Sequence, residues 1–307
     1  MDAVIQINEL CKTFKGEQTI LNVNMRINKG EIYGFLGPNG AGKTTIMKMM
    51  LNLVKPSSGE ILVFNQSIKP ASYQYLKKIG SIIEYPVFYE RLTAKENLEV
   101  HCEYNDCHDK HAVKEAMEIV GLIGAENKKV HEFSLGMKQQ LGIARAIVTK
   151  PEILILDEPI NGLDPIGIKD IRELLVLLKK KFGMTILISS HIVSEVESIA
   201  DTFGIINHGK LLKEVKMDKI RKENTKYLEI KVSNLEKTLQ VLEEKLRITK
   251  YEIVGQQMIR IFEHDISQSK INIELMRNEI EISKMEMKQH SLEEYFLNLI
   301  NKGEQYA

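Results

Sequence analysis

The chain has 307 residues, 42 basic and 42 acidic side chains, and a formal net charge of zero at pH 7. Such a length predicts two domains or one large domain, with a core that needs no disulfide support. The neutral balance disfavours broad electrostatic binding to nucleic acid, so we expect no nucleic-acid partner. The three cysteines form no disulfide framework, which favours a reducing cytoplasmic compartment. Because no stretch approaches the roughly 18 apolar residues of a spanning helix, any work at a membrane requires a separate partner.

The first part of the chain predicts short strands joined by turns. Residues 4–8 and 23–27 alternate apolar and polar side chains, as half-buried strands do. Residues 31–36 are a short apolar run, and residues 60–64 predict a strand after a turn cluster at 55–59. These elements predict a sheet-rich N-terminal region.

A phosphate-binding loop follows the apolar strand at 31–36. The run GPNGAGKTT satisfies G-x-x-x-x-G-K-[ST] at every required position and precedes a helix predicted over residues 44–53. Its glycines let backbone N–H groups approach phosphate oxygens, and the start of the helix adds partial positive charge. Lys43 is predicted to reach the β- and γ-phosphates, and the Thr44 hydroxyl to hold Mg²⁺. The predicted nucleotide-binding residues of the loop are Gly37, Pro38, Asn39, Gly40, Ala41, Gly42, Lys43, Thr44 and Thr45.

A helical insert interrupts this α/β pattern. Residues 93–149 are polar and helix-forming, and Thr93 with Glu96 resembles a capping box. The α/β alternation returns over residues 153–215, where 153–156 and 185–188 predict buried parallel strands. The helix between these two strands has one apolar face, formed by Ile168, Ile171, Leu174, Leu175 and Leu178.

Two carboxylates end the strand at 153–156. Ligands bind at the carboxyl ends of strands in α/β sheets, so Asp157 is expected to orient Mg²⁺ there. Glu158 is expected to orient the attacking water or to accept its proton. The alternative is that both acids cap the next helix, but Pro159 follows them directly at the strand end.

The last part of the chain predicts a small α+β accessory domain over residues 216–307. The predicted order is β-α-β-β-α-β-like. Its segments are a charged linker at 216–226, a strand at 227–232, a helix at 235–246, strand-like residues at 250–262, a helix at 269–277 and an amphipathic helix at 291–300.

The run FSLGM at residues 133–137 completes a resemblance to the ATP-binding-cassette (ABC) ATPases, the motor subunits of ABC transporters. Their signature is usually LSGGQ; Ser134 and Gly136 match it, whereas Leu135 and Met137 depart from it. A serine at a helix start offers donors to phosphate. The resemblance implies that Ser134, Leu135, Gly136 and Met137 contact ATP held by a second copy of the chain.

The resemblance extends over residues 4 to about 215 and implies roles for three further residues. Asp164 ends NGLD, which resembles the D-loop at the dimer interface. His191 resembles the switch histidine that contacts the γ-phosphate, and it joins Glu158 as a catalytic candidate. Phe14 resembles the aromatic residue that stacks on adenine, although phenylalanine is also common in cores. The implied fold is an α/β P-loop NTPase with a RecA-like core over residues 1–215 and a helical insert at about 85–150.

Glu84 occupies the position of a glutamine that in most of these ATPases contacts Mg²⁺ or water. A carboxylate is a harder ligand than an amide, so the expected Mg²⁺ ligands are Thr44, Glu84 and Asp157. The alternative is a substitution without consequence. Together with FSLGMKQ and the late run SLEEYF, this glutamate resembles the bacitracin-resistance and lantibiotic-immunity branch of the ABC exporters.

The resemblance implies an ATPase at the cytoplasmic face of the membrane. It would act as a homodimer that uses ATP and Mg²⁺, together with a separate transmembrane permease, to export or clear a peptide antibiotic such as bacitracin or a lantibiotic. The alternatives are an ABC ATPase for another exported substrate, a soluble ABC ATPase without a transport role, and a module that senses the antibiotic without moving it.

Overall fold

The computed structural model describes residues 2–69, 73–223, 226–262, 267–289 and 296. These residues form two compact units, one within residues 2–217 and the other within residues 218–296. Among the described residues, no helix combines the length and the apolar character that crossing a bilayer requires.

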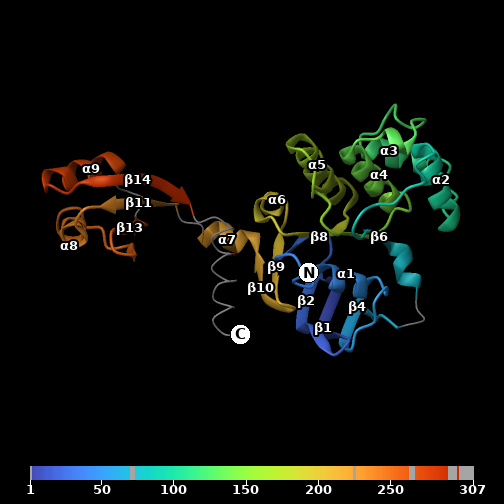
Figure 1. The fold of residues 1–307 in the computed structure, drawn as a ribbon, viewed down its shortest axis with the longest axis horizontal. Helices are drawn as coiled ribbons and strands as arrows, with labels where there is room; N and C mark the ends of the chain where they lie inside the picture. Colours follow the sequence, from blue (N-terminus) through green and yellow to red (C-terminus); the bar gives the residue numbers. More distant parts are fainter. Residues whose placement is uncertain (1, 70–72, 224–225, 263–266, 290–295, 297–307) are drawn as a thin grey trace. The chain divides into compact units, whose positions relative to one another are not determined.

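The larger unit contains a six-stranded sheet in the order β10-β9-β3-β8-β7-β6. Strands β6, β8, β9 and β10 of this sheet are labelled in Figure 1. All neighbours are parallel except β9 and β10, which form an antiparallel hairpin. Strands β3, β7 and β8 are buried along their whole length, as parallel strands covered on both faces are. The predicted strands at 31–36, 153–156 and 185–188 are therefore confirmed. The six strands are β3 (Ile32–Leu36), β6 (Ile79–Ile82), β7 (Ile153–Leu156), β8 (Thr185–Ser190), β9 (Thr202–Asn207) and β10 (Lys210–Lys216).

An antiparallel sheet in the order β2-β1-β4-β5 belongs to the same unit. Its strands are β1 (Ala3–Phe14), β2 (Glu17–Asn28), β4 (Ser58–Val63) and β5 (Gln66–Ser67). Strands β1 and β2 each have 12 residues and extend well beyond the alternating segments at 4–8 and 23–27. Glu9 and Asn22 adopt left-handed φ values of 48° and 47°, and the β1–β2 register shifts near them. These irregularities interrupt the alternation of side chains, so the pattern revealed only part of each strand.

Helix α1 (Lys43–Met50) follows the loop and belongs to the core shared by the two sheets. Its Ile46, Met47 and Met50 are fully buried. Each such burial contributes about 1.5–3 kcal/mol, which holds the loop's helix firmly in place. The sequence pattern predicted that this helix ends at residue 53, but it ends at Met50.

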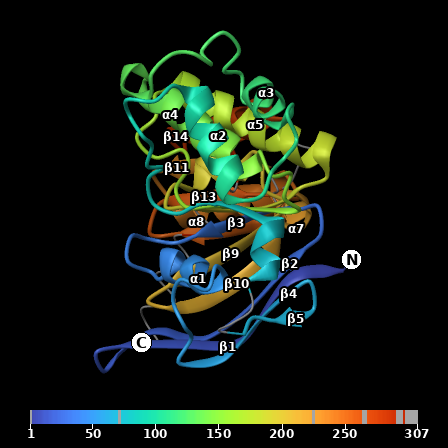
Figure 2. The ribbon, with the colours of Figure 1, turned by 90° about the vertical axis from the view of Figure 1, so that its right-hand side faces the viewer.

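The segment between β6 and β7 is helical, as predicted. Figures 1 and 2 show α2, α3 and α4 gathered on one side of the larger unit, away from the antiparallel sheet. The predicted capping box is confirmed, because Glu96 N donates to Thr93 Oγ1 at 3.2 Å and Thr93 N donates to Glu96 Oε2 at 2.7 Å. Besides α1, the described helices and short 3-10 turns of the unit are η1 (Gln74–Lys78), α2 (Ala94–Tyr104), α3 (Ala112–Ile119), η2 (Val130–Glu132), α4 (Leu135–Ile147), α5 (Pro165–Phe182) and α6 (Val193–Glu197).

The smaller unit has the predicted order β-α-β-β-α-β. Its antiparallel sheet runs β12-β13-β11-β14, and its helices share a core with the sheet residues Leu228, Ile230 and Val232. The elements are β11 (Lys226–Val232), α8 (Leu235–Gln240), the π-helical η3 (Val241–Lys245), β12 (Tyr251–Val254), β13 (Met258–Ile261), α9 (Gln268–Arg277) and β14 (Ile282–Gln289).

The prediction of a charged linker at residues 216–226 is wrong, because helix α7 (Met217–Glu223) lies there. Met217 and Ile220 are its buried apolar residues, too few in a short charged helix to produce a recognisable period. The predicted helix at 291–300 lies outside the described residues, apart from Phe296.

Candidate active site

Four predicted motifs meet at one edge of the six-stranded sheet. Strand β3 leads into the loop at Gly37, β7 into Asp157 and Glu158, β8 into His191, and β6 into Glu84. These strands are parallel neighbours, with β8 between β3 and β7, so their carboxyl ends lie together. The strand order therefore assembles motifs that the sequence keeps far apart.

The loop enters helix α1 with its backbone donors accessible. Gly40 and Gly42 have φ values of 81° and 106°, a region that glycine adopts without steric cost. Gly42 is the N-cap of α1, and none of the described side chains caps the helix there. Uncapped N–H groups at a helix start attract an anion, and Pro38 and Asn39 beside them are exposed. The loop thus fits the phosphate chain of a nucleotide.

Lys43 places a buried ammonium group inside this loop. Its Nζ donates to the backbone oxygens of Gly37 at 2.6 Å and Pro38 at 3.3 Å. The same Nζ lies 3.2 Å from Oε1 of Glu158. Since the side chain is only 6% exposed, these partners together satisfy a charge that would otherwise be costly to bury.

Asp157 is buried and joins the loop helix to strand β8. Its Oδ2 accepts from the Thr44 hydroxyl at 2.7 Å, and its Oδ1 accepts from the Ser189 hydroxyl at 2.6 Å. Ser189 Oγ also accepts from the backbone N–H of Glu158 at 2.8 Å. Ser189 was not among the predicted site residues, although its position two residues before His191 at the end of a buried strand was an available signal.

The oxygen atoms around Thr44 and Asp157 suit a hard cation such as Mg²⁺. Among the described residues there is no group of three or more histidine, cysteine or acidic ligands. Such a sparse protein ligand set fits Mg²⁺, which usually takes one or two carboxylates and completes its shell with water and substrate phosphates.

Glu158 and His191 form a close polar pair. Nδ1 of His191 lies 2.8 Å from Oε2 of Glu158, and the Glu158 side chain is 21% exposed. Glu158 has a left-handed φ of 48°, which is uncommon for a residue with a side chain. The carboxylate is therefore held between His191 on one oxygen and Lys43 on the other.

Glu84 lies at this edge, but its carboxylate has a different partner from those expected. Lys48 Nζ lies 2.6 Å from Glu84 Oε1, and the Glu84 side chain is 62% exposed. The structure thus brings Thr44 and Asp157 together, whereas Glu84 pairs with a lysine one turn farther along α1.

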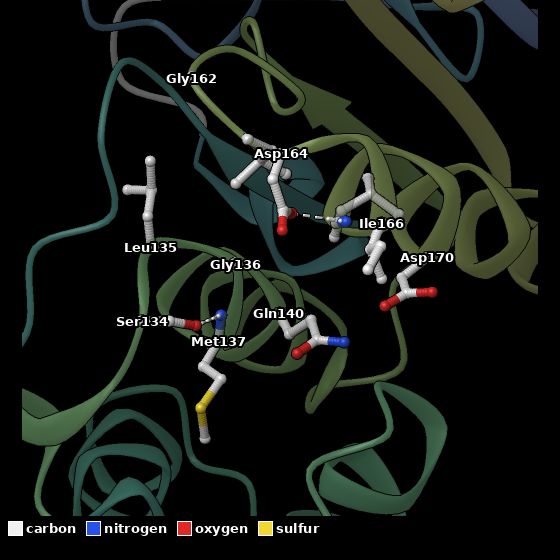
Figure 3. Close-up of a pocket in the computed structure, with 12 residues that line it drawn as sticks. Ser134, Leu135, Gly136, Met137, Gln140, Gly162, Asp164, Ile166 and Asp170 are labelled. Carbon is white, nitrogen blue, oxygen red and sulfur yellow. Dashed lines mark hydrogen bonds between the residues drawn. The ribbon is translucent and has the colours of Figure 1, made fainter.

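The signature and D-loop residues line a pocket of about 440 Å³ (Figure 3). Ser134 is the N-cap of α4 and accepts from Met137 N at 3.2 Å, and Asp164 is the N-cap of α5 and accepts from Gly167 N at 2.9 Å. Figure 3 shows the starts of these two helices on different walls of the pocket. None of residues 37–45 lines it, so it is separate from the phosphate loop. The predicted residues on its wall are Ser134, Leu135, Gly136, Met137 and Asp164.

Phe14 ends strand β1 and is 43% exposed, so the core alternative is wrong. The ammonium of Lys12 lies 4.7 Å from the centre of its ring. An exposed aromatic face of this kind is available for stacking.

Comparison with known proteins agrees with this arrangement. Residues 20–161 match the ABC transporter family. The chain is 54% identical to the ABC transporter ATP-binding protein YcbN of Bacillus subtilis strain 168, over 98% of each chain. It is 46% identical to the bacitracin transport ATP-binding protein BcrA of Bacillus licheniformis, over 99% of each chain. It is also 46% identical to the lantibiotic transport ATP-binding protein SrtF of Streptococcus pyogenes, over 70% of this chain and 92% of that one.

Solved structures of ABC ATP-binding proteins resemble this chain in fold. The cbiO1 protein of Clostridium perfringens, part of an ABC transporter complex, matches with a TM-score of 0.67 and 27% identity over 81% of this chain and 98% of that one. A dimeric ATP-binding cassette bound to ADP and phosphate matches with a TM-score of 0.62 and 25% identity over 69% and 98%. Sequence, fold and site geometry together place this chain among the ATP-binding proteins of ABC transporters, as an ATPase subunit coupled to transport.

Proposed function

We propose that this chain powers the export or clearance of a peptide antibiotic, such as bacitracin or a lantibiotic, through a separate membrane permease. The observation that carries the proposal is full-length similarity to the bacitracin transport ATP-binding proteins of Bacillus licheniformis and Enterococcus faecalis, at 46% and 44% identity over 99% of this chain. The match extends through nearly all of residues 216–307, well beyond residues 20–161, which match the ABC transporter family. Similarity to a lantibiotic transport ATP-binding protein supports the same substrate class.

In this proposal the loop residues Gly37 to Thr45 bind the phosphates of ATP. Lys43 moves its ammonium from the loop carbonyls to the β- and γ-phosphates, which offer stronger charge-assisted bonds. Thr44, Asp157 and Glu84 would hold Mg²⁺, which supplies positive charge to the phosphate oxygens when bound. Phe14 stacks on adenine with its exposed ring.

Glu158 and His191 carry the proposed chemistry. Once Lys43 turns to the phosphates, Oε1 of Glu158 is released to orient the attacking water or to accept its proton. His191 fixes the other carboxylate oxygen at 2.8 Å and so sets the direction of the first. In this arrangement Nδ1 of His191 contacts Glu158, and the other ring nitrogen can donate a hydrogen bond to the γ-phosphate.

Two copies of the chain are proposed to face each other head to tail. Each ATP would lie between the loop of one copy and the signature pocket of the other, because these two sites are separate within one chain. Leu135 and Ile166 on the pocket rim are 49% and 70% exposed, which suits a surface that a second copy covers. ATP stabilises the pair because it contacts both copies at once.

An exposed apolar patch next to Glu84 is the proposed docking surface for the permease. Tyr85, Val87 and Tyr89 are 72%, 79% and 58% exposed. The backbone oxygen of Val87 accepts from Arg145 of α4 at 2.6 Å, so the patch has a fixed support. Docking there would place the chain at the cytoplasmic face of the membrane, with no role for nucleic acid.

We further propose that residues 1–215 form the ATPase domain, with the helical insert at about 85–150, and that residues 216–307 form an accessory domain. The division at residue 217 between the two compact units supports this assignment. The helices α2, α3 and α4 support the proposed extent of the insert.

The decisive experiment measures antibiotic susceptibility of the source cell with and without this chain. The panel contains bacitracin, a lantibiotic and an unrelated drug, and cells complemented with Glu158→Gln are the control. Selective sensitisation to one peptide antibiotic, rescued by the native chain but not by the Gln variant, is the expected result. Unchanged susceptibility would point to another exported substrate if the chain co-fractionates with a membrane protein, and to an ATPase without a transport role if it does not.

A further inference from the structure

We propose that Lys48 is a positioning residue that competes with Mg²⁺ for the carboxylate of Glu84. Lys48 thereby sets the Mg²⁺ concentration that nucleotide binding and hydrolysis require. The inference rests on the proposed function, in which Glu84 belongs to the Mg²⁺ site. It adds a residue outside the phosphate loop, the signature pocket and the catalytic pair.

Helix α1 presents Lys48 on the same side as the proposed metal ligand Thr44. The two residues are four positions apart, a spacing that places side chains one above the other on a helix. The Thr44 hydroxyl contacts Asp157 at 2.7 Å, and Lys48 Nζ contacts Glu84 Oε1 at 2.6 Å. One face of α1 therefore carries the metal site and, one turn later, the cation that now holds Glu84.

The sheet register places the start of the Glu84 segment beside Asp157. Ile82 pairs with Leu156, and the backbone N–H of Asp157 donates to Ile82 O at 2.9 Å. Glu84 follows Ile82 by two residues and has a left-handed φ of 64°. From this position its carboxylate pairs with Lys48, and in the proposed function it would bind a metal ion held by Thr44 and Asp157 instead.

The Lys48–Glu84 pair is suited to exchange rather than to structural support. The two side chains are 32% and 62% exposed, whereas those of the Lys43–Glu158 pair are 6% and 21% exposed. Exposed ion pairs contribute little to stability and are easily replaced. Glu84 would also add a third negative charge near Asp157 and Glu158, and Lys48 offsets that charge until a metal ion does so.

The test titrates Mg²⁺ against binding of a fluorescent ATP analogue and, separately, against the hydrolysis rate. The variants are Lys48→Met, which keeps the aliphatic part of the side chain, Glu84→Gln and the double variant. We expect Lys48→Met to lower the half-saturating Mg²⁺ concentration about two- to fivefold, the range that an exposed ion pair supports. Glu84→Gln should raise it, and adding Lys48→Met to Glu84→Gln should change nothing further.

Lys78→Met is the matched control. It breaks the exposed Lys78–Glu152 pair of 2.8 Å, which lies at the opposite end of strands β6 and β7, so it should leave both titrations unchanged. The proposal is overturned if Lys48→Met behaves like this control, or if its shift persists in the Glu84→Gln background. If Glu84→Gln itself shifts neither titration, the assignment of Glu84 to the metal site fails. Absence of hydrolysis by the native chain would instead count against the proposed function.

Discussion

Nδ1 of His191 lies 2.8 Å from Oε2 of Glu158, while Nζ of Lys43 lies 3.2 Å from the other oxygen of the same carboxylate. Glu158 thus has one oxygen tied to the end of β8 and the other tied to the phosphate loop. In the proposed function, movement of Lys43 toward phosphate would free one oxygen of Glu158 and leave the other bound to His191. These two contacts would then couple nucleotide binding to the proposed catalytic role of Glu158.

Glu158→Gln is expected to lower ATP hydrolysis at least about 100-fold, because an amide cannot accept the proton that general-base catalysis transfers. The amide keeps the size of the side chain, so ATP binding should persist and the ATP-bound dimer should accumulate. Light scattering with and without ATP measures the dimer, and phosphate release measures turnover. Turnover at the wild-type rate would refute the assigned role.

Ser189→Ala is expected to lower the hydrolysis rate and to destabilise the fold by about 1–3 kcal/mol. The buried hydroxyl donates to Oδ1 of Asp157 and accepts from the backbone N–H of Glu158, and its loss removes both hydrogen bonds, although Thr44 still bonds Oδ2 of Asp157. Ser190→Ala is the control, because that buried hydroxyl bonds Glu195 and Ile192 instead. Both variants should unfold earlier on heating, but only Ser189→Ala should change the rate at saturating ATP. Equal rates for the two variants would reduce Ser189 to a structural role.

Mixing two inactive variants tests the head-to-tail dimer. Lys43→Ala removes the phosphate contact of one copy, and Ser134→Ala removes the signature contact of the other. A mixed dimer of these variants contains one site with both defects and one intact site. Phosphate release should therefore recover when the two proteins are combined, and it should stay absent in each protein alone. No recovery on mixing would contradict a site shared between copies.

Phe14→Ala is expected to weaken ATP binding by about 1–3 kcal/mol, the range found for stacking of a base on an aromatic ring. Phe14→Tyr keeps the ring and should bind ATP nearly as well. Because Phe14 is 43% exposed, thermal stability should change little in either variant. The measurement is equilibrium binding of ATP and of inorganic triphosphate, which has no base. It separates stacking on the base from binding of the phosphates, since only ATP binding should depend on residue 14.

Glu229 is expected to make the smaller unit acid-sensitive. Burial raises the pKa of this carboxyl group, but Lys288 at 2.6 Å and Arg260 at 3.4 Å outweigh burial and hold the pKa below its ordinary value of 4.5. A lowered carboxyl pKa contributes stability above pH 4.5, and that stability is lost as the pH falls through the lower folded-state pKa.

Glu229→Gln should therefore cost about 1–3 kcal/mol at neutral pH, because charged hydrogen bonds of a buried group are lost. The difference from the native chain should shrink as the pH falls below 4.5. Calorimetry of the full chain across pH measures both effects. Glu286→Gln on the neighbouring strand is the control, because Glu286 is 52% exposed and should change stability little. If the stability difference between Glu229→Gln and the native chain were the same at all pH values, the lowered pKa of Glu229 would be contradicted.

Local physical chemistry made several features readable from the sequence. The spacing of GPNGAGKTT predicts a phosphate-binding loop followed by a helix from residue 44, and in the structure that helix begins at Lys43, directly after the left-handed Gly42. Continuous apolar runs such as 153–156 predict buried strands, and Thr93 with Glu96 predicts a helix start. The short charged helix α7 has a weak local pattern and was not predicted. The last strand of the predicted order was not assigned to residues, although β14 alternates methionine with lysine and glutamate as half-buried strands do.

The strand order of the larger unit, and with it the site, was decided only by the tertiary structure. Hydrogen bonds between distant strands put β8 between β3 and β7, and this order brings Lys43, Asp157, Glu158 and His191 together. The bridging role of Ser189 and the Lys48–Glu84 pair follow from the same packing. Sequence spacing encodes the conformation of each short segment, whereas pairing between segments depends on contacts that exist only once the sheet has formed.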